Sequence, residues 1–119
     1  MSARPSKKFE DTVTLTANAF GLLLRDKRSC GVALPTEKLL TEFATILAGY
    51  LESESCDYQV LSSDPDIIHR FSEYQCINYS RLDIDSLKDH VFLCIDYDSA
   101  PYNIKRRLKH KPHIRLSVL

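Results

Sequence analysis

Residues 91–98 read VFLCIDYD and begin with five consecutive apolar residues. Successive side chains of a β-strand point to opposite faces of its sheet, so a strand over this run places apolar groups on both faces. Such a strand needs cover on both sides, which is typical of parallel sheets with helices on each face. Cys94, within the run, is therefore interpreted as a small buried hydrophobe.

The first half of the chain predicts two helices. Residues 34–54 contain the clearer one, which starts near Pro35 and Thr36. Its apolar stripe consists of Leu39, Leu40, Phe43, Ile46, Leu47, Tyr50 and Leu51. Residues 9–28 carry a second stripe at helical spacing, although TVTLT within it alternates as a strand does. We expect this first helix to stop at SCG, with Gly31 as the stop signal.

Short strands and helices alternate over the rest of the chain. The pattern predicts strands over 57–63, 76–80, 91–98 and 113–119, helices over 64–75 and 100–111, and a helical turn or short helix over 83–90. The expected fold is a single small α/β domain over 9–119, after a flexible basic arm at 1–8. Its two N-terminal helices pack on a short mixed or parallel sheet of three or four strands with intervening helices. The alternative is an α+β layout with an antiparallel meander.

Several classes of protein find no support in the composition. The length of 119 residues fits one domain with its own core. Its four cysteines form no CxxC pair, and its three glycines form no phosphate-binding or dinucleotide-binding loop. We expect no cofactor. The N-terminus lacks the apolar core of a secretory signal, and no apolar run reaches membrane-spanning length. We therefore expect a cytoplasmic protein with reduced thiols and no membrane partner.

Two Asp-x-Asp pairs follow predicted strands. Asp64 and Asp66 come after VLSS, and Asp96 and Asp98 end VFLCIDYD. Ligands of open α/β sheets bind beyond the carboxyl ends of the strands, where such pairs can hold Mg²⁺ for phosphoryl transfer. Ordinary structural roles explain them as well: Asp64 as a helix N-cap, Asp66 as a first-turn acid, and the other two as strand-end residues. We assign no metal site to them.

No nucleophile is singled out by its surroundings in the sequence. There is no GxSxG motif, and no spacing favours one cysteine–histidine pair over another. We interpret the histidines as surface residues and assign no catalytic residue: His69, His90, His110 and His113.

The chain ends on a strongly basic stretch. Residues 52–99 carry three Lys/Arg and eleven Asp/Glu, a net charge of −8, whereas residues 100–119 carry six Lys/Arg and no acid, a net charge of +6. On a helix, the cations of 102–111 form one contiguous face with an aromatic side chain among them. The candidate residues for binding a protein or nucleic-acid partner are Tyr102, Lys105, Arg106, Lys109, Lys111 and Arg115.

The final strand and the charge asymmetry lead to the functional hypotheses. IRLSVL places Ile114, Leu116 and Val118 on one face, and the strand either completes its own sheet or joins two copies as an exchanged edge. We expect a non-catalytic binding or regulatory module that acts by protein–protein interaction, as a homo-oligomer. The alternatives are nucleic-acid binding through the basic helix and a metal-dependent phosphoryl-transfer enzyme using the Asp pairs.

Overall fold

The computed structural model describes the backbone of residues 7–119 and the side chains of residues 16–119. Residues 1–6 of the expected basic arm lie outside this part, and Lys7 and Lys8 begin the first helix. The helices are α1 (Lys7–Arg25), α2 (Glu37–Ser53), α3 (Pro65–Arg70) and α4 (Tyr102–Leu108). The strands are β1 (Cys30–Leu34), β2 (Tyr58–Ser62), β3 (Ile77–Asn78), β4 (Val91–Ile95) and β5 (His113–Val118). Short 3-10 turns complete the chain: η1 (Ser72–Tyr74), η2 (Tyr79–Arg81), η3 (Ile84–Ser86) and η4 (Tyr97–Ser99).

The strands form one sheet in the order β1-β5-β4-β2-β3, and every neighbouring pair is parallel. The expected α/β class is confirmed, and the antiparallel α+β alternative is wrong. The sheet has five strands rather than three or four because β1 was missed. Gly31, expected to stop a helix, lies inside β1. This strand is a short edge whose exposed residues are small, so it carries little strand signal.

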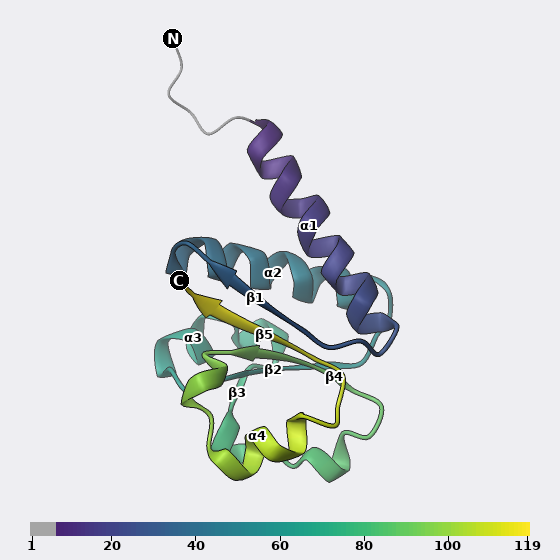
Figure 1. Cartoon of the computed structure of the whole chain (residues 1–119), viewed down its shortest axis with the longest axis vertical. Helices are drawn as coiled ribbons and strands as arrows, with labels where there is room; N and C mark the ends of the chain where they lie inside the picture. The colour runs from purple at the N-terminus through teal and green to yellow at the C-terminus, as the bar shows by residue number, and fades with distance from the viewer. Residues whose placement is uncertain (1–6) are drawn as a thin grey trace.

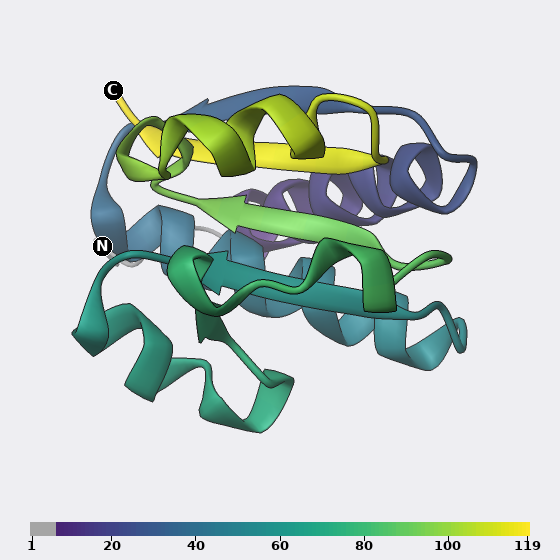
Figure 2. The same ribbon diagram turned by 90° about the horizontal axis from the view of Figure 1, so that it is seen from below.

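The run 91–95 has the two-sided burial that its composition predicts. Val91, Leu93 and Ile95 belong to a core with α1, α2 and α3, whereas Phe92 and Cys94 belong to a second core on the other face. The second core is closed by the η2 and η3 turns and by Leu108 of α4. Figure 1 shows α2 and α4 on opposite sides of the sheet, and Figure 2 shows the same layers from below.

Two predicted helix starts are confirmed in atomic detail. The Thr36 side chain accepts a hydrogen bond from the Leu39 amide (3.2 Å) at the start of α2. The Asp64 carboxylate accepts one from the Asp66 amide (2.9 Å), and Pro65 occupies the first turn of α3. Asp64 is therefore the N-cap that the sequence predicts. None of the described helices is long and apolar enough to cross a membrane.

The closing strand completes the sheet of its own chain. β5 lies between β1 and β4 and pairs with both, so the exchanged-edge alternative does not describe this structure. Ile114 and Leu116 are fully buried, as their alternation predicts. Val118, expected on the same face, is 44% exposed because the strand has by then passed the core.

The position of β5 predicts different effects for two neighbouring truncations. Ile114→Ala should lower the free energy of unfolding by about 2–5 kcal/mol, because it leaves a cavity between the sheet and α2. Val118→Ala should cost less than about 1 kcal/mol, because its side chain is partly in solvent. Urea unfolding of both variants measures the difference. Equal losses would contradict the described depth of β5.

Candidate functional site

The expected basic helix exists as α4, which is shorter than predicted and packs on the sheet through Leu108. Its cations do not form one surface. The six candidate residues fall into three groups: two around Tyr97, one near Asp85, and three on the side facing away from the sheet.

The first group surrounds the ring of Tyr97. Lys105 Nζ lies 5.8 Å and Arg115 Cζ 5.9 Å from the ring centroid. Both distances are within the range of cation–π attraction. Lys105 also donates a hydrogen bond to the Asp98 carbonyl (3.0 Å). These two cations are therefore held by contacts within the domain, and sequence reasoning did not assign Tyr97 this role.

His113 fixes the position of Arg115. Its ring stacks on Tyr97, with centroids 5.8 Å apart, and Nδ1 lies 2.8 Å from the Lys111 carbonyl oxygen. Burial lowers the pKa of His113 and favours the neutral ring, so Nε2 can accept from Arg115 Nη1 at 3.2 Å. The expectation that His113 lies on the surface is wrong: it is 3% exposed. Strand alternation predicts that the side chains of residues 113 and 115 lie on the same face of the sheet. It does not predict that His113 is buried.

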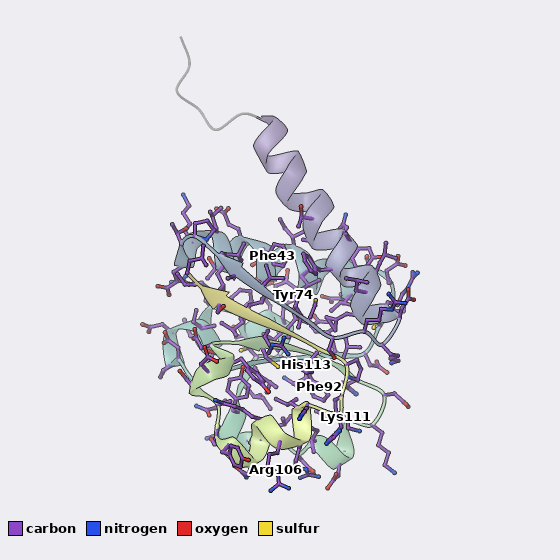
Figure 3. The ribbon with its side chains drawn as sticks, viewed as in Figure 1. Phe43, Tyr74, Phe92, Arg106, Lys111 and His113 are labelled. Atoms are coloured by element: carbon purple, nitrogen blue, oxygen red, sulfur yellow. The ribbon has the colours of Figure 1, made fainter. Side chains whose placement is uncertain are left out.

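The second group is Lys111, which together with Arg107, a cation outside the six candidates, neutralises part of the acidic segment. Arg107 forms an ion pair with Asp85 of η3, and this contact holds the pKa of Asp85 below its ordinary value. The positive charge of Lys111 acts on the same carboxyl group. Lys111 is partly buried, and in Figure 3 it lies nearer the sheet than Arg106 does.

The third group is the α4 outer face, which consists of Tyr102, Arg106 and Lys109. These residues are four and three positions apart, so they share one side of the helix. All three are exposed, and Tyr102 is 75% exposed. Within residues 16–119, neither Arg106 nor Lys109 has an ion-pair partner. Figure 3 places Arg106 on the side of α4 away from the sheet.

In the part of the chain that the structure describes, no helix covers a strip of the sheet beside this region. Gly31 and Ala33 of β1 are exposed on the face that α4 covers elsewhere. A shallow cavity of about 220 Å³ lies there, bordered by Tyr97, Asp98 and Arg115. Arg115 lies over Gly31, where a β-carbon would be 3.1 Å from its guanidinium. The fixed Arg115 therefore occupies one side of this cavity.

The Asp pairs lie where the chain reverses its winding direction. From β2 the chain proceeds to β3 on one side, and from β4 to β5 on the other, so the loops after β2 and β4 diverge. Asp64 and Asp96 interact there, and Glu37 from the start of α2 acts on Asp96 as well. Burial, followed by the charges of Asp64 and Glu37, raises the pKa of Asp96. Asp66 and Asp98 are exposed to solvent.

This arrangement supplies no set of metal ligands. Across residues 16–119, no three His, Cys, Asp or Glu side chains are placed to hold a metal ion together. The Asp64 carboxylate is already used as a helix cap. Asp96 has a left-handed backbone conformation, with φ of 55°, which directs the chain from β4 into η4. Structural roles thus account for Asp64 and Asp96.

Comparison with known proteins identifies no family for this chain. No protein-family model, no curated protein and no solved structure matches it with significance.

The environment of Asp96 predicts a pH-dependent effect of Asp96→Asn. Because the folded-state pKa of Asp96 is raised, the native protein binds this proton more tightly than the unfolded chain does. The wild type therefore loses stability as pH rises from the unfolded pKa through the folded pKa. Asn tolerates positive φ as Asp does and cannot ionise. The variant should be more stable than the wild type at pH 7, by an increment that disappears near pH 3.

Urea unfolding at the two pH values measures this increment. Asp66→Asn, at an exposed carboxylate in the first turn of α3, is the control and should show no comparable increment. An Asp96→Asn variant that is less stable than the wild type at pH 7 would contradict the electrostatic argument.

Proposed function

We propose that this chain is a non-catalytic binding module that acts through protein–protein contact, and that the α4 outer face docks on an acidic surface of the partner. The observation that carries the proposal is the division of the cations. Lys105, Arg107 and Arg115 are engaged within the domain, whereas Arg106 and Lys109 lie exposed beside Tyr102.

The composition of this face supports a protein partner. Tyrosine and arginine are the side chains that most often contribute large shares of binding energy in protein interfaces. A tyrosine ring that is 75% exposed has much apolar surface left to bury. Arg106 and Lys109, which have no acidic partner within residues 16–119, favour a partner of opposite charge and accelerate its association.

A second copy of the chain is one source of such an acidic surface. Segment 52–99 has a net charge of −8, and only part of this charge is compensated by α4 through the pair of Arg107 with Asp85. Docking of α4 on this segment of another molecule would produce a homo-oligomer. Such contacts would weaken as salt screens the charges.

The test is a charge reversal on the α4 outer face. Arg106→Glu should weaken partner binding at least about tenfold, because a glutamate placed against an acidic surface is repelled, and like-charge contacts in an interface cost several kcal/mol. Lys38→Glu is the matched control, because Lys38 is exposed on α2 across the sheet. Proteins captured from nuclease-treated extract of the native host are identified, purified and titrated against each variant. Sedimentation of the chain alone measures self-association.

Loss of a purified partner's binding in Arg106→Glu but not in Lys38→Glu is the expected result. Equal affinity of both variants and the wild type for every purified partner, together with unchanged sedimentation, would refute docking through α4.

Single-stranded nucleic acid is a second candidate partner for the same face. The favouring observation is the exposed Tyr102 ring next to Arg106 and Lys109, because bases stack on such rings while cations contact phosphates. Fluorescence anisotropy with labelled oligonucleotides at low salt tests it. Binding should fall steeply with salt and lose about 1–3 kcal/mol in Tyr102→Ala. Absence of binding at low salt would exclude this candidate.

A further inference from the structure

The two edges of the sheet differ in how well they can accept another strand. On one side the edge is β3, which contains two residues before the chain turns into η2. On the other side the edge is β1, which contains five residues and pairs with β5 alone. In Figure 2, β1 forms the upper rim of the sheet, and no described element lies beyond it. The β1 edge is therefore open to another strand.

The hydrogen bonds of the domain show which backbone groups of this edge are unused. In a strand, the N–H and C=O of one residue point to the same side, and those of the next residue point to the opposite side. The Leu34 carbonyl accepts a hydrogen bond from the Leu119 amide (2.9 Å), so every second residue counted back from Leu34 directs its backbone groups toward β5. The backbone groups of Gly31 and Ala33 consequently point away from the sheet, where another strand can bind them.

The β1 edge lacks the features that usually prevent strands from pairing between molecules. Natural edge strands are commonly protected by lysine, proline, a bulge or an inward-pointing charge. The sequence of β1, CGVAL, contains no charge and no proline, and its pairing with β5 is continuous. Gly31 and Ala33 are small and exposed, so their side chains do not hinder a neighbouring strand.

Antiparallel pairing of two β1 strands uses all of these groups in one register. When two copies overlap over the full five residues, Val32 lies opposite Val32 of the other copy, on a twofold axis. Gly31 then lies opposite Ala33 on both sides of the axis, and each of these pairs exchanges two hydrogen bonds. On the other face, Cys30 lies opposite Leu34, so partly buried apolar side chains meet each other. The strand is therefore complementary to a second copy of itself.

The charges beside β1 favour the same arrangement. Cations precede the strand and an acid follows it, so antiparallel pairing brings the start of each copy toward the end of the other. Continued beyond the strands, this register brings Lys27 toward Glu37 and Asp26 toward Lys38, which are pairs of opposite charge. The Lys27 ammonium donates to the Asp89 carbonyl (3.3 Å), and neither Lys27 nor Glu37 forms an ion pair within residues 16–119. Both charges are thus left for a second copy.

We propose that β1 pairs antiparallel with β1 of a second copy, so that the two five-stranded sheets join into one continuous sheet. The hydrogen-bond register, the apolar face and the flanking charges each select this partner. The assembly closes at two molecules, because both β1 edges are then occupied. This surface differs from the α4 outer face, and the inference does not depend on docking through α4.

The test is analytical ultracentrifugation of the full chain and of Ala33→Pro. This substitution removes an outward N–H group without removing a hydrogen bond to β5, and it places a proline ring on the edge. Val32 already has the extended conformation that a residue before proline adopts. The wild type should sediment as a concentration-dependent dimer, and Ala33→Pro should sediment as a monomer. Ala33→Ser keeps the N–H group at the same exposed position, so this matched control should dimerise as the wild type does.

A charge reversal beside β1 tests the same contact without changing the strand. Glu37→Lys should weaken dimerisation about tenfold, because twofold symmetry creates its repulsion with Lys27 twice. Glu42→Lys makes the same change of charge at an exposed position of the same helix and should leave dimerisation unchanged. Adding Lys27→Glu to Glu37→Lys should restore the dimer, because opposite charges then approach each other again.

Circular dichroism and urea unfolding establish that each variant is folded. The proposal is overturned if the wild type remains monomeric at millimolar concentration, or if folded Ala33→Pro dimerises as Ala33→Ser does. If Ala33→Pro does not fold, equal dimerisation of Glu37→Lys and Glu42→Lys overturns it. Arg106→Glu should dimerise normally. Loss of the dimer in Arg106→Glu but not in the β1 variants would overturn pairing through β1 and assign self-association to α4.

Discussion

The structure depends on covering β4 on both faces. A strand whose five side chains are all buried would lose much of its stabilisation if either layer were absent, since each buried aliphatic or aromatic group contributes about 1.5–3 kcal/mol. One layer is built from long helices, α1 and α2. The other is built from short 3-10 turns and the seven-residue α4. The basic segment is therefore part of the protein's second core and is not an appended tail.

The strand order relates the domain to a common doubly wound arrangement. If β2 is counted as strand 1, the strands β2 to β5 become strands 1 to 4. They then lie in the order 2-1-3-4 of that arrangement, and β1 occupies the place of its fifth strand. The edge position is thus filled by the N-terminal strand.

The formal net charge of the chain is zero, but the cations of its C-terminal segment have two different environments. Arg107 and Lys105 connect α4 to the acidic segment through Asp85 and the Asp98 carbonyl, so part of the charge separation is internal. Arg106 and Lys109 remain directed to solvent. At the other end of the strands, neither Glu52 nor Glu73 forms an ion pair within residues 16–119. The proposed docking face lies where internal pairing is incomplete.

The sequence by itself determined the elements whose side chains obey a strict period. The stripe of α2, the Asp64 cap and the two-sided burial of β4 follow from local spacing, because backbone geometry alone places those side chains. It did not reveal β1, since a short edge strand of small residues has no strong period. Only the tertiary structure decided which cations of α4 are engaged, that His113 is buried under Tyr97, and that β1 pairs with β5 at the edge of the sheet. These contacts join residues far apart in the chain, and their partners are set by how the layers pack.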